Sequence, residues 1–309
     1  MLKLHFETLT PLHISNGNEL AYGLEYTLRN NVFRKFNFAR ISSILASGNA
    51  FDFSKNISVR DIEKIIDDNF NKYSQDDFFY KIKIHPKFYE LTRNSRATGQ
   101  KFVQEFINSN GKFYVPGSTI KGALLSVLKY DHLGINNDDS GKIEQKFVIR
   151  DSENIEQDNF IVYTTENRPP SVNLMCMKAG IKFDVDILKM GILKKDYLIE
   201  KLRTYSKKQI NLAVSNLQPY KGRDGREKGA DIFEKGLESI LGYNLNENEY
   251  LINLGFGGGS WFKAYENIVP KFPSKSRARR NQPEPAHTSF SVFLKNQTIH
   301  IGWCKIKID

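Results

Sequence analysis

The sequence predicts an α+β fold, because alternating strands and amphipathic helices follow one another along its 309 residues. Residues 2–7 alternate apolar and polar side chains, as a half-buried strand does, and residues 181–187 repeat that pattern. Between them, residues 118–128 place their apolar side chains on one helical stripe. This order fits a ferredoxin-like β-α-β-β-α-β module that carries an insertion of about residues 20–112 after its first strand.

The remaining elements follow from the same patterns. Ser58 precedes an amphipathic helix that ends near Phe70, and residues 102–107 indicate a further short helix, so the insertion is expected to be helical. Short strands are predicted at residues 147–150 and 160–164, a longer helix at 193–202, and a closing strand at 299–308 with a bulge near Cys304.

The charge of the chain favours a polyanionic partner. The formal net charge is +10, and residues 271–280 hold five basic side chains and no acidic one. Residues 219–230 hold four basic side chains among three glycines. Such stretches can follow a phosphodiester backbone, although each alone is more often a solvated loop. We expect a flanking electrostatic track for RNA at Arg223, Arg226, Arg277, Arg279 and Arg280.

Several classes of protein are disfavoured. The two cysteines, Cys176 and Cys304, lack CxxC spacing, and no pair of the six histidines has metal-ligand spacing, so we expect neither a disulfide, a metal site nor a cofactor. The first residues, MLKLHFETLT, show no charged-then-apolar leader, and no apolar run is long enough to cross a bilayer. We therefore expect a cytoplasmic protein without a membrane partner.

The segment PGSTIKG, residues 116–122, is the first candidate phosphate site. Its proline and glycine end the preceding strand, and Ser118 is a natural N-cap for the helix that follows. The first helical turn then offers backbone N–H groups, with Thr119 and Lys121 beside them. Gly122 has no Cβ and would let another backbone approach. The alternative is a capped core helix with a packing glycine.

The glycine-rich segment LGFGGGSWFK, residues 254–263, is the second candidate site. Consecutive glycines allow several N–H groups to converge on one phosphate. The segment is neither a dinucleotide fingerprint, since a serine replaces the last glycine, nor a Walker loop, since GK[ST] is absent. The alternative is a tight turn whose aromatic side chains enter the core. The expected contacts are Gly257, Gly258, Gly259, Ser260 and Lys263.

The segment TPLHISNG, residues 10–17, supplies the third expected contact through His13, Ser15 and Asn16. A metal-independent ribonuclease needs a histidine as general base, and His13 is the best placed of the six. A structural or RNA-contacting histidine is the more common case. Because no compact carboxylate pair and no GxSxG motif occur, we expect no catalytic residue, with His13 as the alternative.

The three segments, in this order, resemble the RAMP superfamily of CRISPR-associated RNA-binding proteins. YTLRNNVFRKFNF at residues 26–38 and RDSENI at residues 150–155 extend the likeness to the subunits that cap the CRISPR RNA 3′ end in type III-A (Csm) effector complexes. The resemblance implies tandem ferredoxin-like, RRM-like modules. These would be an N-terminal domain at residues 1–190, with a thumb-like hairpin at about 155–171, and a C-terminal half at 191–309 that carries the glycine-rich segment.

The resemblance also implies a function. The chain would be a non-catalytic subunit that grips the 3′ region of the CRISPR RNA by its backbone and is needed for 3′-end maturation, through recruited cellular nucleases. Its neighbours would be the backbone RAMP subunit and the small helical subunit of the complex. Two alternatives stay open: a RAMP endoribonuclease that processes CRISPR repeats, and a target-RNA-cleaving backbone RAMP subunit.

Overall fold

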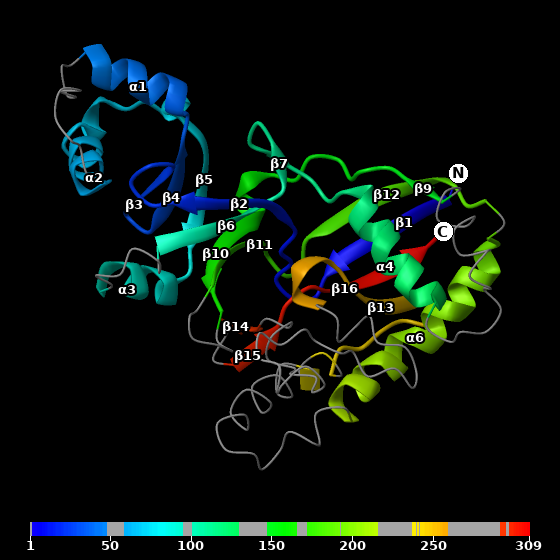
Figure 1. Cartoon of the computed structure of the whole chain (residues 1–309). Coiled ribbons are helices and arrows are strands. Elements are labelled where there is room, and N and C mark those ends of the chain that lie inside the picture. The colour runs from blue at the N-terminus through cyan, green and yellow to red at the C-terminus, as the bar shows by residue number, and fades with distance from the viewer. Residues whose placement is uncertain are drawn as a thin grey trace, which may run out of the picture.

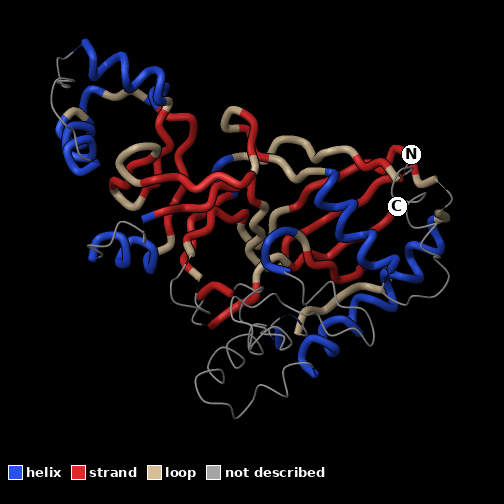
Figure 2. Tube along the Cα trace, viewed as in Figure 1, coloured by secondary structure: helices blue, strands red, loops and turns tan. Residues whose placement is uncertain are grey.

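The computed structural model describes residues 2–47, 59–94, 101–129, 147–165, 172–191, 193–215, 237–238, 240, 242–258, 291–294 and 297–309. These residues form two principal β-sheets with helices around them (Figure 1). The strands lie in the middle of the described chain and the longer helices at its periphery, as Figure 2 shows. The α+β class that the sequence predicts is therefore confirmed.

The first sheet is the ferredoxin-like module. Its five strands lie in the order β13-β16-β1-β12-β9, and every neighbouring pair is antiparallel. Helix α4 contacts β9 and α6, and α6 contacts β13, so the two helices cover one side of the sheet. The bounds are β1 Leu2–Thr8, α4 Gly117–Lys129, β9 Val148–Ile149, β12 Lys182–Lys189, α6 Lys195–Ser215, β13 Glu249–Asn253 and β16 Trp303–Ile308.

In chain order these elements read β1-α4-β9-β12-α6-β13, which is the predicted module. The last strand, β16, adds a feature that the sequence did not predict, because it inserts between β1 and β13. A strand has two hydrogen-bonding edges, and β1 uses one for β12 and the other for β16. Residues on both sides of position 190 thus build one sheet, so the expected division at 190 does not separate the sheets.

The second sheet is built from the insertion and one hairpin. Its seven strands lie in the order β2-β6-β11-β10-β5-β4-β3. In its described part the insertion also carries helices α1, α2 and α3, which lie at the end of the molecule away from α4 and α6 (Figure 1). The bounds are β2 Ser15–Ala21, β3 Tyr26–Arg29, β4 Val32–Phe36, α1 Phe38–Ser47, α2 Val59–Asp68, β5 Phe78–Ile84, α3 Pro86–Asn94, β6 Phe102–Phe106, β10 Phe160–Thr164 and β11 Asn173–Met177.

Short elements complete the described chain. The two-stranded pairs are β7 Asn108–Ser109 with β8 Lys112–Phe113, and β14 Ser291–Leu294 with β15 Gln297–His300. The 3₁₀ turns are η1 Phe70–Lys72, η2 Gln75–Asp77, η4 Gln157–Asn159 and η6 Gly255–Gly258. Among the described residues no helix combines the length and the apolar character that crossing a bilayer requires.

Three sequence expectations need correction. Residues 102–107 are not a helix, because Phe102–Phe106 is strand β6 with Val103 and Glu105 both buried. Among the described residues, the insertion therefore contains four strands of the second sheet, β3 to β6, besides its helices, and β2 leads into it. The break in the closing strand lies at Gly302, not near Cys304, because the Gly302 φ of +90° is one that only glycine adopts readily.

The hairpin β10–β11 corresponds to the thumb-like hairpin expected at about residues 155–171. Its strands lie in the centre of the seven-stranded sheet, and β11 is buried along its whole length. The described part of the hairpin therefore belongs to the core. Residues 166–171, at its tip, lie outside the described residues.

One hydrophobic core joins the two sheets. Side chains from both belong to a single cluster, and the rings of Phe6 and Phe183 stack within it at 5.0 Å between centroids. Fully burying an aromatic side chain of this kind stabilises a fold by about 1.5–3 kcal/mol. The ferredoxin-like module and the insertion are consequently parts of one packed body.

Candidate nucleic-acid interface

The start of helix α4 is held by the segment that follows β9. The backbone N–H of Gly117 donates to the Asp151 carboxylate at 2.7 Å. Ser152 pairs with Val115 twice: its Oγ accepts from the Val115 N–H at 2.8 Å, and its own N–H donates to the Val115 carbonyl at 3.0 Å. PGSTIKG and RDSENI, separated in sequence, therefore form one structural unit.

Position 117 must be a glycine, because the backbone of Ile149 approaches it closely. A Cβ at this position would lie 2.2 Å from the carbonyl oxygen of Ile149, closer than any real contact. Sequence reasoning named Ser118 as the N-cap, and that assignment is wrong, because the helix begins at Gly117 and the acceptor is Asp151. The Gly117 N–H is thus already bonded to a carboxylate of the same chain.

The next residues of α4 face outward. Ser118 and Gly122 are exposed, while Thr119 and Lys121 are partly exposed. A Cβ on Gly122 would have nothing within 4 Å, so the alternative reading of Gly122 as a packing glycine does not hold. A phosphate at this helix would meet the Ser118 hydroxyl, Lys121 and the open surface at Gly122, and not the first N–H group.

TPLHISNG and the glycine-rich segment contact each other directly. Gly255 has a φ of +71°, and a Cβ there would lie 2.2 Å from the carbonyl oxygen of His13. That carbonyl accepts the Phe256 N–H at 2.9 Å. The Gly302 N–H donates to the Pro11 carbonyl at 2.8 Å, so the end of the chain joins the same unit. The tertiary structure thus brings two of the three predicted segments together.

His13 lies inside this unit and not at its surface. Its side chain is fully buried, and Nδ1 donates to the Met175 carbonyl at 2.7 Å. The ring meets Phe106 and Phe256 edge-on. Burial lowers the pKa of His13 to about 4, so the ring is neutral at pH 7. In this geometry the His13 ring lies inside the fold, between Met175 and Phe256.

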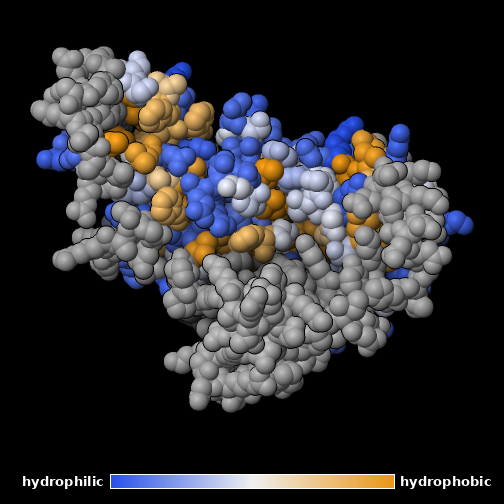
Figure 3. Space-filling model, viewed as in Figure 1, coloured by the Kyte–Doolittle hydropathy of each residue, from blue (hydrophilic) through white to orange (hydrophobic). Residues whose placement is uncertain are grey.

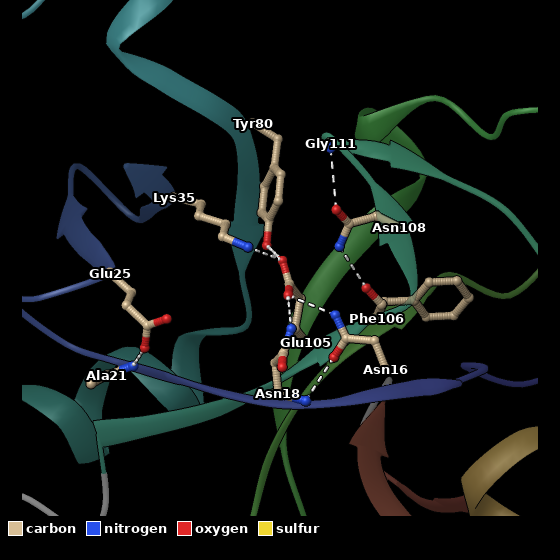
Figure 4. Close-up of polar contacts among 10 residues, drawn as sticks. All are labelled: Asn16, Asn18, Ala21, Glu25, Lys35, Tyr80, Glu105, Phe106, Asn108 and Gly111. Carbon is tan, nitrogen blue, oxygen red and sulfur yellow. Dashed lines mark hydrogen bonds and ion pairs between the residues drawn. The ribbon is translucent and has the colours of Figure 1, made fainter. Parts of the chain in front are cut away.

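Ser15 and Asn16 organise the turn that follows. The Ser15 hydroxyl accepts the Gly17 N–H at 2.9 Å, and the Asn16 Oδ1 accepts the Asn18 N–H at 2.8 Å. The Asn16 Nδ2 donates at 2.8 Å to Glu105, as Figure 4 shows. Both side chains are partly exposed, so they can meet a ligand while they hold this turn.

Glu105 is a functional candidate that sequence reasoning missed. Its side chain is 1% exposed and is bonded to Lys35 at 2.5 Å and to the Tyr80 hydroxyl at 2.6 Å (Figure 4). Burial alone would raise the pKa of Glu105, but the hydrogen bonds from Lys35, Tyr80 and Asn16 lower it overall. Val103 and Glu105 are two positions apart, so in a strand both side chains face the core, and this spacing was the available signal.

The remaining predicted contacts belong to the glycine-rich segment and to the two basic stretches. Gly257 and Gly258 lie in η6, beside the His13 unit. Gly259, Ser260, Lys263, Arg223, Arg226, Arg277, Arg279 and Arg280 lie outside the described residues.

The open side of the ferredoxin-like sheet carries paired charges. Lys305 bridges Glu249 at 3.0 Å and Glu7 at 3.3 Å, and Lys3 lies 3.5 Å from Asp184. A groove of about 660 Å³ beside it is lined by Arg150, Asp151, Asp184 and Asp186, among others. Base stacking requires exposed aromatic rings, and this sheet side presents charged residues instead.

The viewed face of the molecule has the same character. In Figure 3 the visible described residues are mostly hydrophilic in the middle, and hydrophobic residues are exposed in separate small groups. Among the described residues no three His, Cys, Asp or Glu side chains are grouped so that they could hold a metal ion. The face seen in Figure 3 is therefore mainly polar in the part that the structure describes.

The model of the RAMP superfamily matches residues 5–263, a span that contains all three segments. This chain belongs to the RAMP superfamily. The family assignment made from the three motifs is thereby confirmed. One relative of this chain is the CRISPR system Cms protein Csm5 of Methanocaldococcus jannaschii, which is 26% identical over 312 residues, covering 84% of this chain and 71% of the relative.

Two solved structures have the same fold. A chain in the cryo-EM structure of a Csm–crRNA–target RNA ternary complex of a type III-A CRISPR-Cas system matches with a TM-score of 0.62 and 16% identity, with 100% of both chains covered. The crystal structure of T. onnurineus Csm5 matches with a TM-score of 0.52 and 16% identity, covering 83% of this chain and 90% of that one. Both likenesses concern the fold of this RAMP protein.

Proposed function

We propose that this RAMP protein is a non-catalytic subunit of a type III-A CRISPR effector complex that holds the 3′ region of the CRISPR RNA by its phosphate backbone. The relative and the solved structures carry the Csm name, which supports the complex as its setting. In that setting the backbone RAMP subunit and the small helical subunit would be neighbours. Maturation of the 3′ end would fall to recruited nucleases.

The observation that carries the RNA contact is the open surface of α4. Glycine inside a helix costs about 0.5–1 kcal/mol relative to alanine. Gly122 is exposed, and a Cβ there would meet nothing within 4 Å, so no contact among the described residues explains the glycine. Together with Ser118 and Lys121 it leaves space and donors for a phosphate chain at close range.

The endoribonuclease alternative is less well supported. A general base must come within hydrogen-bond reach of the proton that it removes. His13 is fully buried, and its Nδ1 is bonded to the Met175 carbonyl. The proposed role of His13 is to hold TPLHISNG and the glycine-rich segment together.

Labelled-RNA binding tests the proposal, with mature CRISPR RNA, its repeat-containing precursor and a scrambled RNA compared at several salt concentrations. Lys121→Ala should flatten the slope of log affinity against log salt by about 0.7, the value for one phosphate contact on a single strand. The matched control is Lys195→Ala, which removes the same charge from the exposed first turn of α6. Equal effects of the two variants would remove Lys121 from the site.

The same samples, incubated without metal and then with magnesium or manganese, test the absence of chemistry. Intact RNA throughout supports a binding subunit. Cuts in the repeat that are abolished by His13→Ala would establish the endoribonuclease. Cuts at regular intervals in a complementary target RNA would establish a target-cleaving backbone subunit.

A further inference from the structure

A row of basic side chains lies on one face of strands β3, β4 and β5, far from α4. Arg34 of β4 is directly opposite Lys81 of β5. Two positions away on each strand, Val32 is directly opposite Lys83. Arg29 is opposite Val32 on the other side. Residues two apart in a strand share a face. Arg29, Arg34, Lys81 and Lys83 therefore form one continuous row, called the basic strip below.

The two arginines of the strip are held in place. The Arg34 guanidinium donates to the Arg29 carbonyl at 2.7 Å and to the Val32 carbonyl at 3.2 Å. The Arg29 and Arg34 guanidinium carbons lie 4.4 and 5.6 Å from the centroid of the Phe70 ring. Such stacking orders a guanidinium and leaves its outer N–H groups available.

The charges of the strip are balanced only at Arg29 and only in part, because burial raises the pKa of Asp67 while the charge of Arg29 lowers it. Within the part of the chain that the structure describes, none of its four side chains lies within ion-pair distance of a carboxylate, and Lys81 is bonded to the neutral Gln75. Burial and then Arg29 lower the pKa of Arg34, and burial and then Arg34 lower the pKa of Lys81. The like charges therefore influence one another.

The other sheet provides a contrast. There Lys3, Lys305 and Lys307 each meet a carboxylate within 4 Å. Like charges directly opposite each other on neighbouring strands destabilise a sheet. Arg34 opposite Lys81 is such a pair, and a bound polyanion would relieve its repulsion.

We propose that the basic strip is a second RNA-binding site, which takes the phosphate backbone of a single strand at the insertion end of the molecule. The inference rests on the proposed function, since it gives the same RNA a further contact. The strip lies at the opposite end of the described chain from α4 (Figure 1). Only an RNA long enough to reach both ends would gain from it, so the strip would favour long strands over short ones.

The test measures affinity for a short and a long single-stranded RNA between 50 and 200 mM salt. The double variant Arg34→Gln/Lys81→Gln should lower the salt slope for the long RNA by about 1.4, which corresponds to two phosphate contacts. The short RNA should bind as it does to the unmodified protein. The matched control, Lys305→Gln/Lys307→Gln, removes two charges from the paired sheet and should leave the slope for the long RNA unchanged.

A second variant tests the strip if the double variant does not fold. Lys83 is exposed, and Lys83→Gln alone should lower the slope by about 0.7. If both strip variants leave the slope unchanged while Lys121→Ala still weakens binding, the strip is not an RNA-binding site. The proposed function of the protein would then still stand. Loss of slope in the strip variants alone would support the strip and count against α4. Polyaspartate that competes as well as RNA of equal charge would overturn it in favour of an acidic protein partner.

Discussion

Asp151 and Gly117 are 34 positions apart in the sequence, yet the Asp151 carboxylate accepts the backbone N–H of Gly117 at 2.7 Å. The bond ties the segment after β9 to the first residue of α4. A carboxylate at a helix N-terminus satisfies an orphan donor and complements the helix dipole. Both effects fix the position from which α4 presents Ser118 and Lys121.

Replacing Asp151 should therefore destabilise the fold modestly. Asp151→Ala should lower the free energy of unfolding by about 1 kcal/mol, the usual cost of a lost cap, and Asp151→Asn should cost less because it keeps an acceptor. Denaturant unfolding measures both. Asp158→Ala, at an exposed position in η4, is the control and should change little. Equal losses at the two positions would show that the carboxylate contributes nothing as a cap.

Two glycines should respond in opposite ways to alanine. Gly255→Ala should destabilise by at least about 1–3 kcal/mol, because it strains a positive φ and places a Cβ 2.2 Å from the His13 carbonyl oxygen. Gly122→Ala should stabilise the free protein by about 0.5–1 kcal/mol, since its site is open. Thermal unfolding of the two variants measures both changes in stability. If Gly122→Ala were destabilising, the helix would have a packing contact there.

Gly122→Ala should also weaken RNA binding while it stabilises the protein. A methyl group at that point would occupy the space proposed for the phosphate chain. Affinity for mature CRISPR RNA, measured on the same samples, separates the two effects. Unchanged affinity would place the RNA elsewhere on α4.

Glu105 should dominate the acid sensitivity of the second sheet. Its pKa is lowered on folding, so its contribution is present above the unfolded value of about 4.5 and is lost as the pH falls through the folded value. Glu105→Ala would leave Lys35, Tyr80 and Asn16 without their acceptor, and should cost about 3 kcal/mol or more at pH 7. Denaturant unfolding at pH 7 and at pH 4 measures both effects.

The control for this prediction is Glu156→Gln, an exposed carboxylate without a cap bond, which should alter neither the stability nor its pH dependence. A Glu105→Gln variant with the same pH profile as the unmodified protein would contradict the assignment.

His5 should give the opposite pH dependence. A hydrogen bond to Asp309 is the largest cause that raises the pKa of His5; burial opposes it, and Asp184 adds to it. Because the folded pKa is raised, the stabilisation is complete below about pH 6.5 and is lost as the pH rises through the folded value. Unfolding of the unmodified protein and of His5→Gln between pH 6 and 9 should converge at the upper end. A constant difference would exclude the titration of His5 as its cause.

Local patterns were sufficient to predict several elements. The alternation of residues 2–7 and 181–187 predicted β1 and β12, and the stripe after Pro116 predicted α4. These patterns are readable because one side of each element faces the core and the other faces solvent. Strand β6 escaped prediction because its inward position is Glu105, whose carboxylate is satisfied by partners from three other strands.

The sequence by itself determined the α+β class, the module order and the three segments that identify the RAMP superfamily, because periodicity and turn residues act over a few positions. The tertiary structure alone decided which of those residues face outward. It buried His13 against Met175, paired the Asp151 carboxylate with the Gly117 N–H and left the surface at Gly122 open. It also inserted β16 beside β1. These outcomes depend on hydrogen bonds between residues far apart in the chain, and no local pattern encodes which distant partner satisfies a given donor.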